Sequence, residues 1–389
     1  MSNLEELIER LCPDGVEYKE IGSIAVLGAG GDVPKARFSA EKTVEFNIPI
    51  YSNGIEEKAI YGYTDIPKVD EPSITISARG TIGWCALRKE PFYPIVRLIY
   101  VTPNTEILVD FLKYVIDTIK FKVPKTGIPQ LTIPMVSKYK VPVPPLEVQR
   151  EIVRILDNFT FLTAELAAEL AARQKQYEYY RDLLLTFKPN ESTILNERTN
   201  ELELSGAIRW MKLGDIADIG TGNGNTNEGL DTGKYPFFVR SQDIKYKNEY
   251  DFDETAIITS GDGVGVGKIF HFVSGKYALH QRAYRVHITS DNVLPKYFFY
   301  YFKNSFLTYI SKASFHSSVT SIRRPMMINF PVPVPPLEVQ QRIVDILDRF
   351  DALCNDISSG LPAEIEARQK QYEYYRDKLL NFKELKKEA

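Results

Sequence analysis

Cysteine and histidine are scarce in this sequence of 389 residues, and neither is arranged to build a site. The three cysteines lie far apart without a CxxC pair, and the four histidines show no HExxH-like spacing. This pattern argues against a disulfide framework and against a zinc centre. We expect reduced thiols and no metal bound by this chain.

Long apolar runs are also missing. No window contains eighteen uninterrupted apolar residues, and the first residues, MSNLEELIER, are acidic and amphipathic. We therefore expect no membrane-spanning helix, no secretory signal and a cytoplasmic protein. With 44% hydrophobic and 25% charged residues the composition is that of an ordinary globular protein, and the length favours two or more domains.

The net charge of −3 gives little support to nucleic-acid binding until it is divided along the chain. Residues 20–145 carry 15 basic and 13 acidic side chains, a balance of +2. Residues 208–335 carry 15 and 11, a balance of +4. These two segments are therefore the positive ones, which is compatible with contact to phosphates but does not establish it.

An internal repeat is the strongest feature of the sequence. Residues 141–157 read VPVPPLEVQREIVRILD, and residues 332–348 read VPVPPLEVQQRIVDILD. Further on, RQKQYEYYRDLLLTF at residues 173–187 recurs as RQKQYEYYRDKLLNF at residues 368–382. The first pair is offset by 191 residues and the second by 195, so the second copy holds four extra residues between its blocks. The order along the chain is variable, constant, variable, constant.

Both constant blocks have the apolar spacing of a long helix that packs along a partner helix. Their apolar residues advance in alternating steps of three and four. A proline pair precedes each block and favours a helix start there, because proline is tolerated in a first turn. In the second block Gly360 and Pro362 predict a break near residues 358–362.

The obvious partner of each long helix is the other copy. If the copies pack antiparallel, each leads from one variable segment to the other, and the chain nearly closes on itself about a pseudo-two-fold axis. A helix of about 40 residues is roughly 60 Å long, so two reading domains can reach separate stretches of one duplex. A domain core or a homodimeric coiled coil is the simpler alternative, but it does not account for domain-sized inserts between the copies.

The LEVQxxIVxILD and RQKQYEYYRDxLLxF blocks resemble the conserved regions of specificity subunits of type I restriction–modification systems, and so does TAELAAELAA from Thr163 onward. The resemblance covers the whole chain in layout, with specific motifs only in the constant blocks. It implies two target-recognition domains, each reading half of an interrupted asymmetric site in double-stranded DNA. It also implies two modification subunits that methylate adenine and motor–nuclease restriction subunits. Their S-adenosylmethionine, ATP and Mg²⁺ are expected on those partners and not on this chain.

We therefore expect an α+β fold in which two mixed α/β target-recognition domains are separated by two long antiparallel spacer helices with pseudo-two-fold symmetry. The expected segments are 1–145 and 208–335 for the target-recognition domains, 146–188 and 336–389 for the spacer helices, and 189–207 for a linker. In this family, repeats of the four-residue TAEL unit lengthen the central helix and change the gap between the half-sites. The resemblance assigns that spacer role to Thr163, Leu166 and Leu170.

The chain contains no complete catalytic motif, so we expect a subunit without enzymatic activity of its own. VLGAGG at residues 26–31 resembles a cofactor-binding glycine turn, but no acidic residue follows where a ribose requires one. An NPPY- or DPPY-type element for methylating adenine is missing as well. GDGVGVGK at residues 261–268 departs from a P-loop, because Asp262 replaces a glycine and Ile269 replaces the Ser/Thr.

Loops of both variable segments carry residue types that can address base edges or phosphates. A turn former or a solvated charge is an equally good interpretation of any single one of them, so the prediction concerns clusters. In the first segment the candidates are Tyr51, Ser52, Asn53, Arg79, Lys125, Thr126 and Gln130. In the second they are Arg240, Ser241, Gln242, Asp243, Asp262, His316, Ser317, Ser318, Thr320, Arg323 and Arg324.

The repeated tyrosines of the constant blocks invite a base-stacking interpretation. Their recurrence on a helical seam, beside an arginine in each copy, favours helix pairing or docking of the modification subunits instead. The candidates for this role are Tyr177, Tyr180, Arg181, Tyr372, Tyr375 and Arg376.

Two other classes of protein stay open. A coiled-coil adaptor that binds only proteins predicts that neither the chain nor its complex binds DNA selectively. A self-sufficient methyltransferase–nuclease requires methyl transfer by the lone chain, which the missing motifs oppose.

Overall fold

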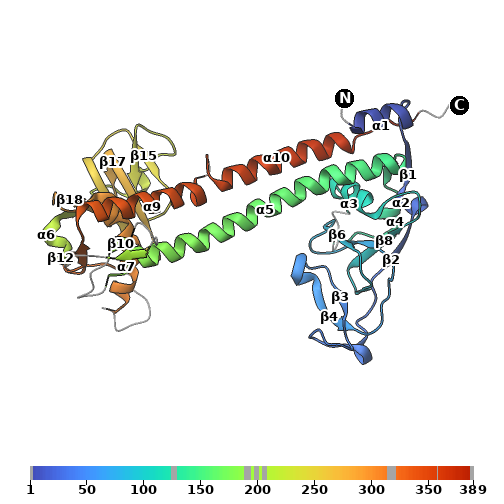
Figure 1. Ribbon diagram of the computed structural model, residues 1–389, viewed down its shortest axis with the longest axis horizontal. Coiled ribbons are helices and arrows are strands. Elements are labelled where there is room, and N and C mark those ends of the chain that lie inside the picture. Colours follow the sequence, from blue (N-terminus) through green and yellow to red (C-terminus); the bar gives the residue numbers. More distant parts are fainter. Residues whose placement is uncertain are drawn as a thin grey trace. The chain divides into compact units, whose positions relative to one another are not determined.

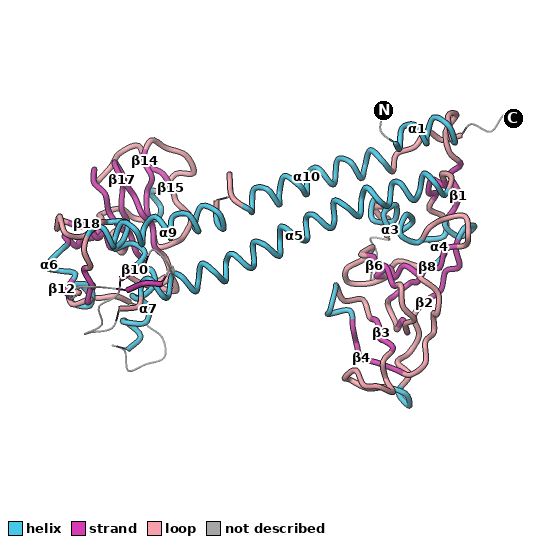
Figure 2. The backbone as a smooth tube through the Cα atoms, in the orientation of Figure 1, coloured by secondary structure: helices cyan, strands magenta, loops and turns pink. Residues whose placement is uncertain are grey.

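The computed structural model describes most of the chain, which divides into two compact units. The described residues are 3–123, 129–187, 208–312, 321–356 and 358–385, with the backbone alone of 194–196 and 201–203. Unit 1 comprises residues 1–167 and 365–389, and unit 2 comprises residues 168–364. Each contains helices and strands (Figures 1 and 2), so the prediction of an α+β fold is confirmed.

The two units repeat one order of elements. After α1 (Asn3–Leu11), unit 1 continues with β1 (Glu17–Glu20), α2 (Ile21–Ile24), β2 (Ala25–Ala29), β3 (Ile48–Tyr51), β4 (Ile60–Thr64), β5 (Ser73–Ser77), β6 (Cys85–Arg88), β7 (Tyr93–Pro94), β8 (Leu98–Pro103), α3 (Val109–Thr118), α4 (Ile133–Ser137) and β9 (Lys140–Val143). Unit 2 has β12 (Arg209–Lys212), α6 (Leu213–Ile216), β13 (Ala217–Thr221), β14 (Tyr235–Phe238), β15 (Lys245–Lys247), β16 (Phe252–Ser260), β17 (Phe270–Leu279), β18 (Ala283–Ile288), α7 (Pro295–Lys312), α8 (Arg324–Ile328) and β19 (Pro331–Val334).

The sheets of the two units are variants of one arrangement. Unit 2 holds a six-stranded sheet of order β13-β18-β16-β17-β14-β15. In unit 1 the corresponding strands form a four-stranded sheet, β2-β8-β5-β6, and a three-stranded sheet, β4-β3-β7. In unit 2 the ten-residue β17 pairs with both β16 and β14. In unit 1 two shorter strands take these places, because β6 pairs with β5 and β7 pairs with β3. In both units two strands outside these sheets pair as a separate antiparallel ribbon, β1 with β9 and β12 with β19.

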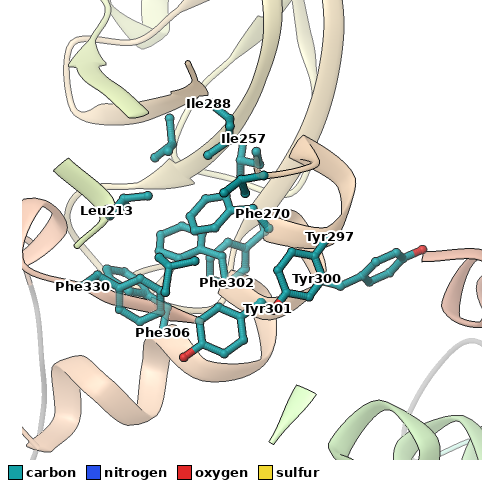
Figure 3. Packing of buried hydrophobic residues seen from close by; sticks show 14 of the residues in the cluster. Leu213, Ile257, Phe270, Ile288, Tyr297, Tyr300, Tyr301, Phe302, Phe306 and Phe330 are labelled. Carbon is teal, nitrogen blue, oxygen red and sulfur yellow. The ribbon is translucent and has the colours of Figure 1, made fainter. Parts of the chain in front are cut away.

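The core of unit 2 contains a cluster of aromatic rings, most of them on α7 (Figure 3). Phe302 packs against Phe306 with ring centroids 4.4 Å apart, and Phe330 meets Phe306 edge-to-face at 5.4 Å. All three are at most 1% exposed. Rings of this size bury much apolar area and prefer tilted or edge-to-face contacts, so this cluster fixes α7 on the sheet.

The long helices begin where the proline pairs predict. Helix α5 (Leu146–Leu185) starts directly after Pro145, and α9 (Leu337–Asn355) starts directly after Pro336. The second constant block is divided, since α9 ends at Asn355 and α10 spans Leu361–Leu379. Between them, a side chain at Gly360 would lie 2.5 Å from the carbonyl oxygen of Ala352, so the chain passes too close for any larger residue.

Each unit contains its own stretch of paired long helices. In unit 1 the ring of Phe159 on α5 stacks on Tyr375 of α10 at 5.4 Å. In unit 2 Tyr180 of α5 stacks on Phe350 of α9 at 5.7 Å. The residue nearer the start of α5 contacts the later residue of the second block, and the residue nearer the end of α5 contacts the earlier one. The pairing is therefore antiparallel, as predicted. The boundary between the units crosses α5 after Ala167.

The two ends of the described chain meet in unit 1. The N–H of Val16 donates to the carbonyl of Lys383 at 2.9 Å, and the N–H of Leu385 donates back to Val16 at 2.8 Å. The linker segment contains a short hairpin, β10 (Ile194–Asn196) with β11 (Glu201–Glu203). None of the helices in the described part of the chain is long and apolar enough to cross a membrane.

Candidate nucleic-acid interface

Three predicted residues of unit 1 meet where β3 and β5 end. Arg79, two residues beyond β5, donates from Nε to Oε1 of Gln130 at 2.9 Å. Asn53, two residues beyond β3, donates from Nδ2 to the carbonyl of Arg79, also at 2.9 Å. All three are half-buried. Two loops are thereby held to each other, and Arg79 keeps further N–H groups that are free to donate.

A hollow of about 600 Å³ opens beside this cluster and contains an arginine that the sequence analysis missed. Arg97 is exposed and has a φ of 78°, in the left-handed region that residues other than glycine rarely adopt. In the described part of the chain its guanidinium has no hydrogen-bond or ion-pair partner. The lining also includes Ala29, Gly30, Ala78, Arg79, Val96, Leu98, Ile99, Gln130, Leu131, Thr132, Ile133 and Pro134.

The other predicted residues of unit 1 have local roles or lie elsewhere. The ring of Tyr51 is covered by the guanidinium of Arg88, 3.6 Å from the ring centroid. The hydroxyl of Ser52 donates to Oδ1 of Asn53 at 3.2 Å. Lys125 and Thr126 lie outside the described residues. In unit 1 the candidate residues that lie together are therefore Asn53, Arg79 and Gln130, with Arg97 beside them.

In unit 2 a carboxylate joins two arginines. Asp262, two residues beyond β16, accepts from Nη1 of Arg240 at 2.7 Å and from Nη1 of Arg282 at 3.0 Å. The exposed fraction of the side chain is 25% for Asp262 but 39% for Arg240 and 61% for Arg282. The acid is thus the inner group, and both guanidinium groups extend from it towards solvent. Arg240 and Asp262 were predicted, whereas Arg282 was missed.

Protonation in this cluster follows from burial and from the two arginines. Burial raises the pKa of Asp262, but the hydrogen bonds from Arg240 and Arg282 outweigh it and hold the pKa below its usual value. His280 accepts the N–H of Arg282 through Nδ1 at 3.0 Å. Burial, followed by the positive charge of Arg240, lowers the pKa of His280. At neutral pH the cluster therefore contains a carboxylate, two guanidinium groups and a neutral imidazole.

The remaining candidates of unit 2 are spread over two loops. The hydroxyl of Ser241 donates to the carbonyl of Asp243 at 2.9 Å, which shapes the loop after β14. Gln242 and Asp243 are exposed on this loop. Arg323 and Arg324 are exposed where α8 begins. The residues that lie outside the described part of the chain are His316, Ser317, Ser318 and Thr320.

Three of the candidate tyrosines on the long helices lie on faces that pair within a unit. Tyr177 and Tyr180 both contact Phe350 in unit 2, and Tyr372 packs into the core of unit 1. Arg181 and Arg376 each lie over the tyrosine four residues earlier on the same helix and pair with the aspartate that follows. Thr163 donates to the carbonyl of Phe159 at 2.9 Å, and Leu166 and Leu170 are half-buried.

Comparison with known proteins identifies the family. The sequence pattern described as type I restriction modification DNA specificity domain matches residues 13–173 and again residues 208–367. The chain belongs to this family: it is a specificity subunit of a type I restriction–modification system with two target-recognition domains. This is the class that the sequence predicted, a subunit without a catalytic centre of its own.

Relatives of known name agree with this assignment. A Haemophilus influenzae protein named as a type I restriction enzyme specificity subunit is 30% identical over 98% of this chain and 100% of its own length. The Escherichia coli EcoR124I/EcoR124II specificity subunit is 36% identical over 63% of this chain. That match spans 64% of the Escherichia coli protein, so its activity and partners do not transfer directly.

Solved structures agree on the fold. The specificity subunit of the type I system of Mycoplasma genitalium superposes with a TM-score of 0.60, covering 94% of this chain and 96% of that one at 15% identity. A chain from a structure of the assembly and conformational transition of a type I system gives a TM-score of 0.56, covering 96% and 99% at 16% identity. At such low identity the likeness concerns the fold alone.

Proposed function

We propose that this chain reads a bipartite, asymmetric site in double-stranded DNA, with one target-recognition domain for each half-site. The observation that carries the proposal is that each of the two family domains presents an arginine-containing cluster at the same place in its fold. Two different readers in one chain require two different half-sites. We take residues 1–145 and 208–335 as the two readers.

The residue types of the two clusters suit contact with DNA. Arginine can address guanine in the major groove with two hydrogen bonds, and glutamine and asparagine can address adenine in the same way. The clusters contain these types at loop ends, where a rigid sheet holds them in place. Lysine and arginine elsewhere in the two positively charged segments can contact phosphates, which adds affinity without sequence preference.

The duplicated helices suit two copies of one partner, which we take to be the adenine-methylating modification subunits. Tyr179 is 64% exposed, and Tyr374, its equivalent in the second block, is 63% exposed. Each meets the next tyrosine edge-to-face with ring centroids 5.4 Å apart. Unit 1 and unit 2 thus present the same exposed aromatic group. Motor–nuclease restriction subunits complete the complex that we propose.

Co-expression with the neighbouring modification subunit, followed by sequencing of methylated sites, tests the proposal. A methylated adenine motif in two parts with a fixed gap is the expected result. A continuous motif, or methylation without sequence preference, contradicts it. If the purified complex also binds no duplex selectively, the adaptor interpretation replaces it.

A further inference from the structure

The two clusters occupy equivalent positions, as the main-chain hydrogen bonds of the two sheets show. In unit 1 the N–H of Ala78 donates to the carbonyl of Arg97 at 2.8 Å. In unit 2 the N–H of Gly261 donates to the carbonyl of Arg282 at 2.9 Å. Ala78 and Gly261 each follow the last residue of the central strand, β5 or β16. Arg97 in unit 1 therefore corresponds to Arg282 in unit 2.

Two further positions correspond in the same way. Arg79 and Asp262 each lie two residues beyond the end of the central strand, β5 or β16, so they correspond. The last residue of β3 accepts the N–H of Ile95, and the last residue of β14 accepts that of His280. Asn53 and Arg240 each lie two residues beyond that strand end, so they correspond.

The fourth position comes from the segment before α4 or α8. The N–H of Leu131 donates to the carbonyl of Ala78 at 2.9 Å, and that of Ile322 donates to the carbonyl of Gly261 at 2.8 Å. The preceding residues, Gln130 and Ser321, therefore correspond. We call these four positions the recognition frame. They are occupied by Asn53, Arg79, Arg97 and Gln130 in unit 1 and by Arg240, Asp262, Arg282 and Ser321 in unit 2.

One position of the frame is common to both units and three differ. Arginine recurs at 97 and 282, and in both units its carbonyl accepts the N–H of the residue that follows the central strand. The position of Arg79 is taken by Asp262, so the charge at the centre of the frame is reversed. A shared pattern of main-chain hydrogen bonds with exchanged side chains is the arrangement expected of two readers with different target sequences.

The chemistry of unit 2 indicates which base it reads. One oxygen of Asp262 accepts from Arg240 and the other from Arg282, at 2.7 and 3.0 Å. Each guanidinium has five N–H groups and uses one of them here, so donors remain on both. Guanine offers two acceptors, O6 and N7, in the major groove, and arginine is its most common specific partner.

We propose that the recognition frame sets the sequence of each half-site, and that in unit 2 Asp262 holds Arg240 and Arg282 in position to read guanine. Asp262 is a positioning residue in this scheme, because its own oxygens are occupied by the two arginines. The proposal rests on the proposed function, since it assigns base recognition to a site that we infer to contact DNA.

The test uses the full chain assembled with its modification subunit and compares the methylated motifs of the wild type and of single variants. R240Q and R282Q replace a group that suits guanine with one that suits adenine. Each is expected to reduce the preference for guanine at one position of one half-site by about 5- to 150-fold. The other half-site stays unchanged. R79Q, at the central position of the frame in unit 1, changes that other half-site instead.

D262N tests whether Asp262 positions the two arginines or only stabilises the fold. It is expected to weaken the preference at the guanines that R240Q and R282Q affect, without creating a new base preference. K303Q, on an exposed lysine of α7 outside the frame, serves as the matched control and retains the wild-type motif. Where a variant methylates too little DNA to give a motif, competition between duplexes that differ at the guanine measures the same preference.

Two results overturn different parts of the argument. A bipartite wild-type motif that R240Q and R282Q leave unchanged, or in which both half-sites change together, overturns the recognition frame and leaves the proposed function standing. A wild-type complex without a bipartite motif overturns the proposed function itself, and the frame with it.

Discussion

Gln149 and Gln340 make the same three hydrogen bonds in the two units. Oε1 of Gln149 accepts the N–H of Leu108, and its Nε2 donates to the carbonyls of Glu106 and Pro144. Oε1 of Gln340 accepts the N–H of Leu294, and its Nε2 donates to the carbonyls of Asn292 and Pro335. Both side chains are fully buried. Each glutamine thus ties the first turn of a long helix to the loop before α3 or α7.

Replacing Gln340 with leucine is expected to lower the free energy of unfolding of unit 2 by about 3 kcal/mol. The change keeps the volume but leaves one buried N–H and two carbonyls without their partner, and each such loss costs about 1–3 kcal/mol. Urea unfolding of the full chain measures it. Q341L is the control, because Gln341 is exposed and bonds only to Asp345 on its own helix among the described contacts. Equal effects of the two variants would contradict the prediction.

The pairing of α5 with α10 in unit 1 is expected to depend on Phe159 and not on Phe161. Phe159 stacks on Tyr375 at 5.4 Å, whereas Phe161 is 61% exposed. F159A removes a half-buried ring and its stacking contact with Tyr375, which is expected to cost about 2 kcal/mol. F161A is expected to change the stability of the lone chain by less than about 0.5 kcal/mol. Thermal unfolding of both variants measures the two losses of stability. A loss in F161A as large as that in F159A would contradict the prediction that the pairing depends on Phe159.

Tyr179 and Tyr374 are expected to hold one modification subunit each. Y179A and Y374A each remove an exposed aromatic group from one of two equivalent surfaces. Truncating an aromatic residue that anchors an interface typically costs about 2 kcal/mol or more. Each single variant is therefore expected to bind one subunit where the wild type binds two, and the double variant none. Mass measurement of the purified complexes gives the stoichiometry, and two subunits on the double variant would refute the prediction.

The constant half of the fold could be predicted because its signals are local. The repeat, the spacing of apolar residues and the proline pairs together predicted where α5 and α9 begin. Gly360 predicted the break before α10. The alternating spacing of apolar residues also places Leu162 on the seam, four residues before Leu166, and this prediction is wrong because Leu162 is 45% exposed. Two successive steps of four residues follow Leu162, and they shift the apolar stripe around the helix.

The variable half was less predictable because its structure depends on distant pairings. In the order β2-β8-β5-β6, the pairs β2–β8 and β8–β5 join strands that are not consecutive in the chain. Asn53, Arg79 and Gln130 could be predicted from residue type and from their place in loops. Arg97 and Arg282 could not, because only a main-chain bond to a central strand brings each of them to the cluster. Their one signal in the sequence is an arginine directly before a strand.

Unit 2 is expected to lose stability as the pH falls from 7 to 5. His271 is buried in β17 with its ring 5.0 Å from that of Phe238, and burial lowers its pKa. The unfolded chain takes up a proton below about pH 6.5, while the folded unit resists it, so the free energy of unfolding decreases as the pH falls through this range.

H271Q is expected to reduce this pH dependence. Its thermal unfolding, followed at pH 7.5, 6.5 and 5.5 beside the wild type, measures the difference. Some dependence remains in the variant, because the pKa of His280 is lowered too. The same slope in the variant and the wild type would show that His271 does not contribute.

Deleting residues 167–170 is expected to shorten the gap between the half-sites and to leave both half-sites unchanged. The boundary between the units crosses α5 within this segment, and no residue of either recognition frame lies there. Four residues contribute about 6 Å of helix and slightly more than one turn, which corresponds to about one or two base pairs. After the deletion Arg173 follows Leu166 by three residues, so the seam spacing is kept. Replacing Glu169 and Leu170 with alanine keeps the helix length and serves as the control. Sequencing of methylated sites measures the gap, and an unaltered gap in the deletion variant would exclude a spacer role for this segment.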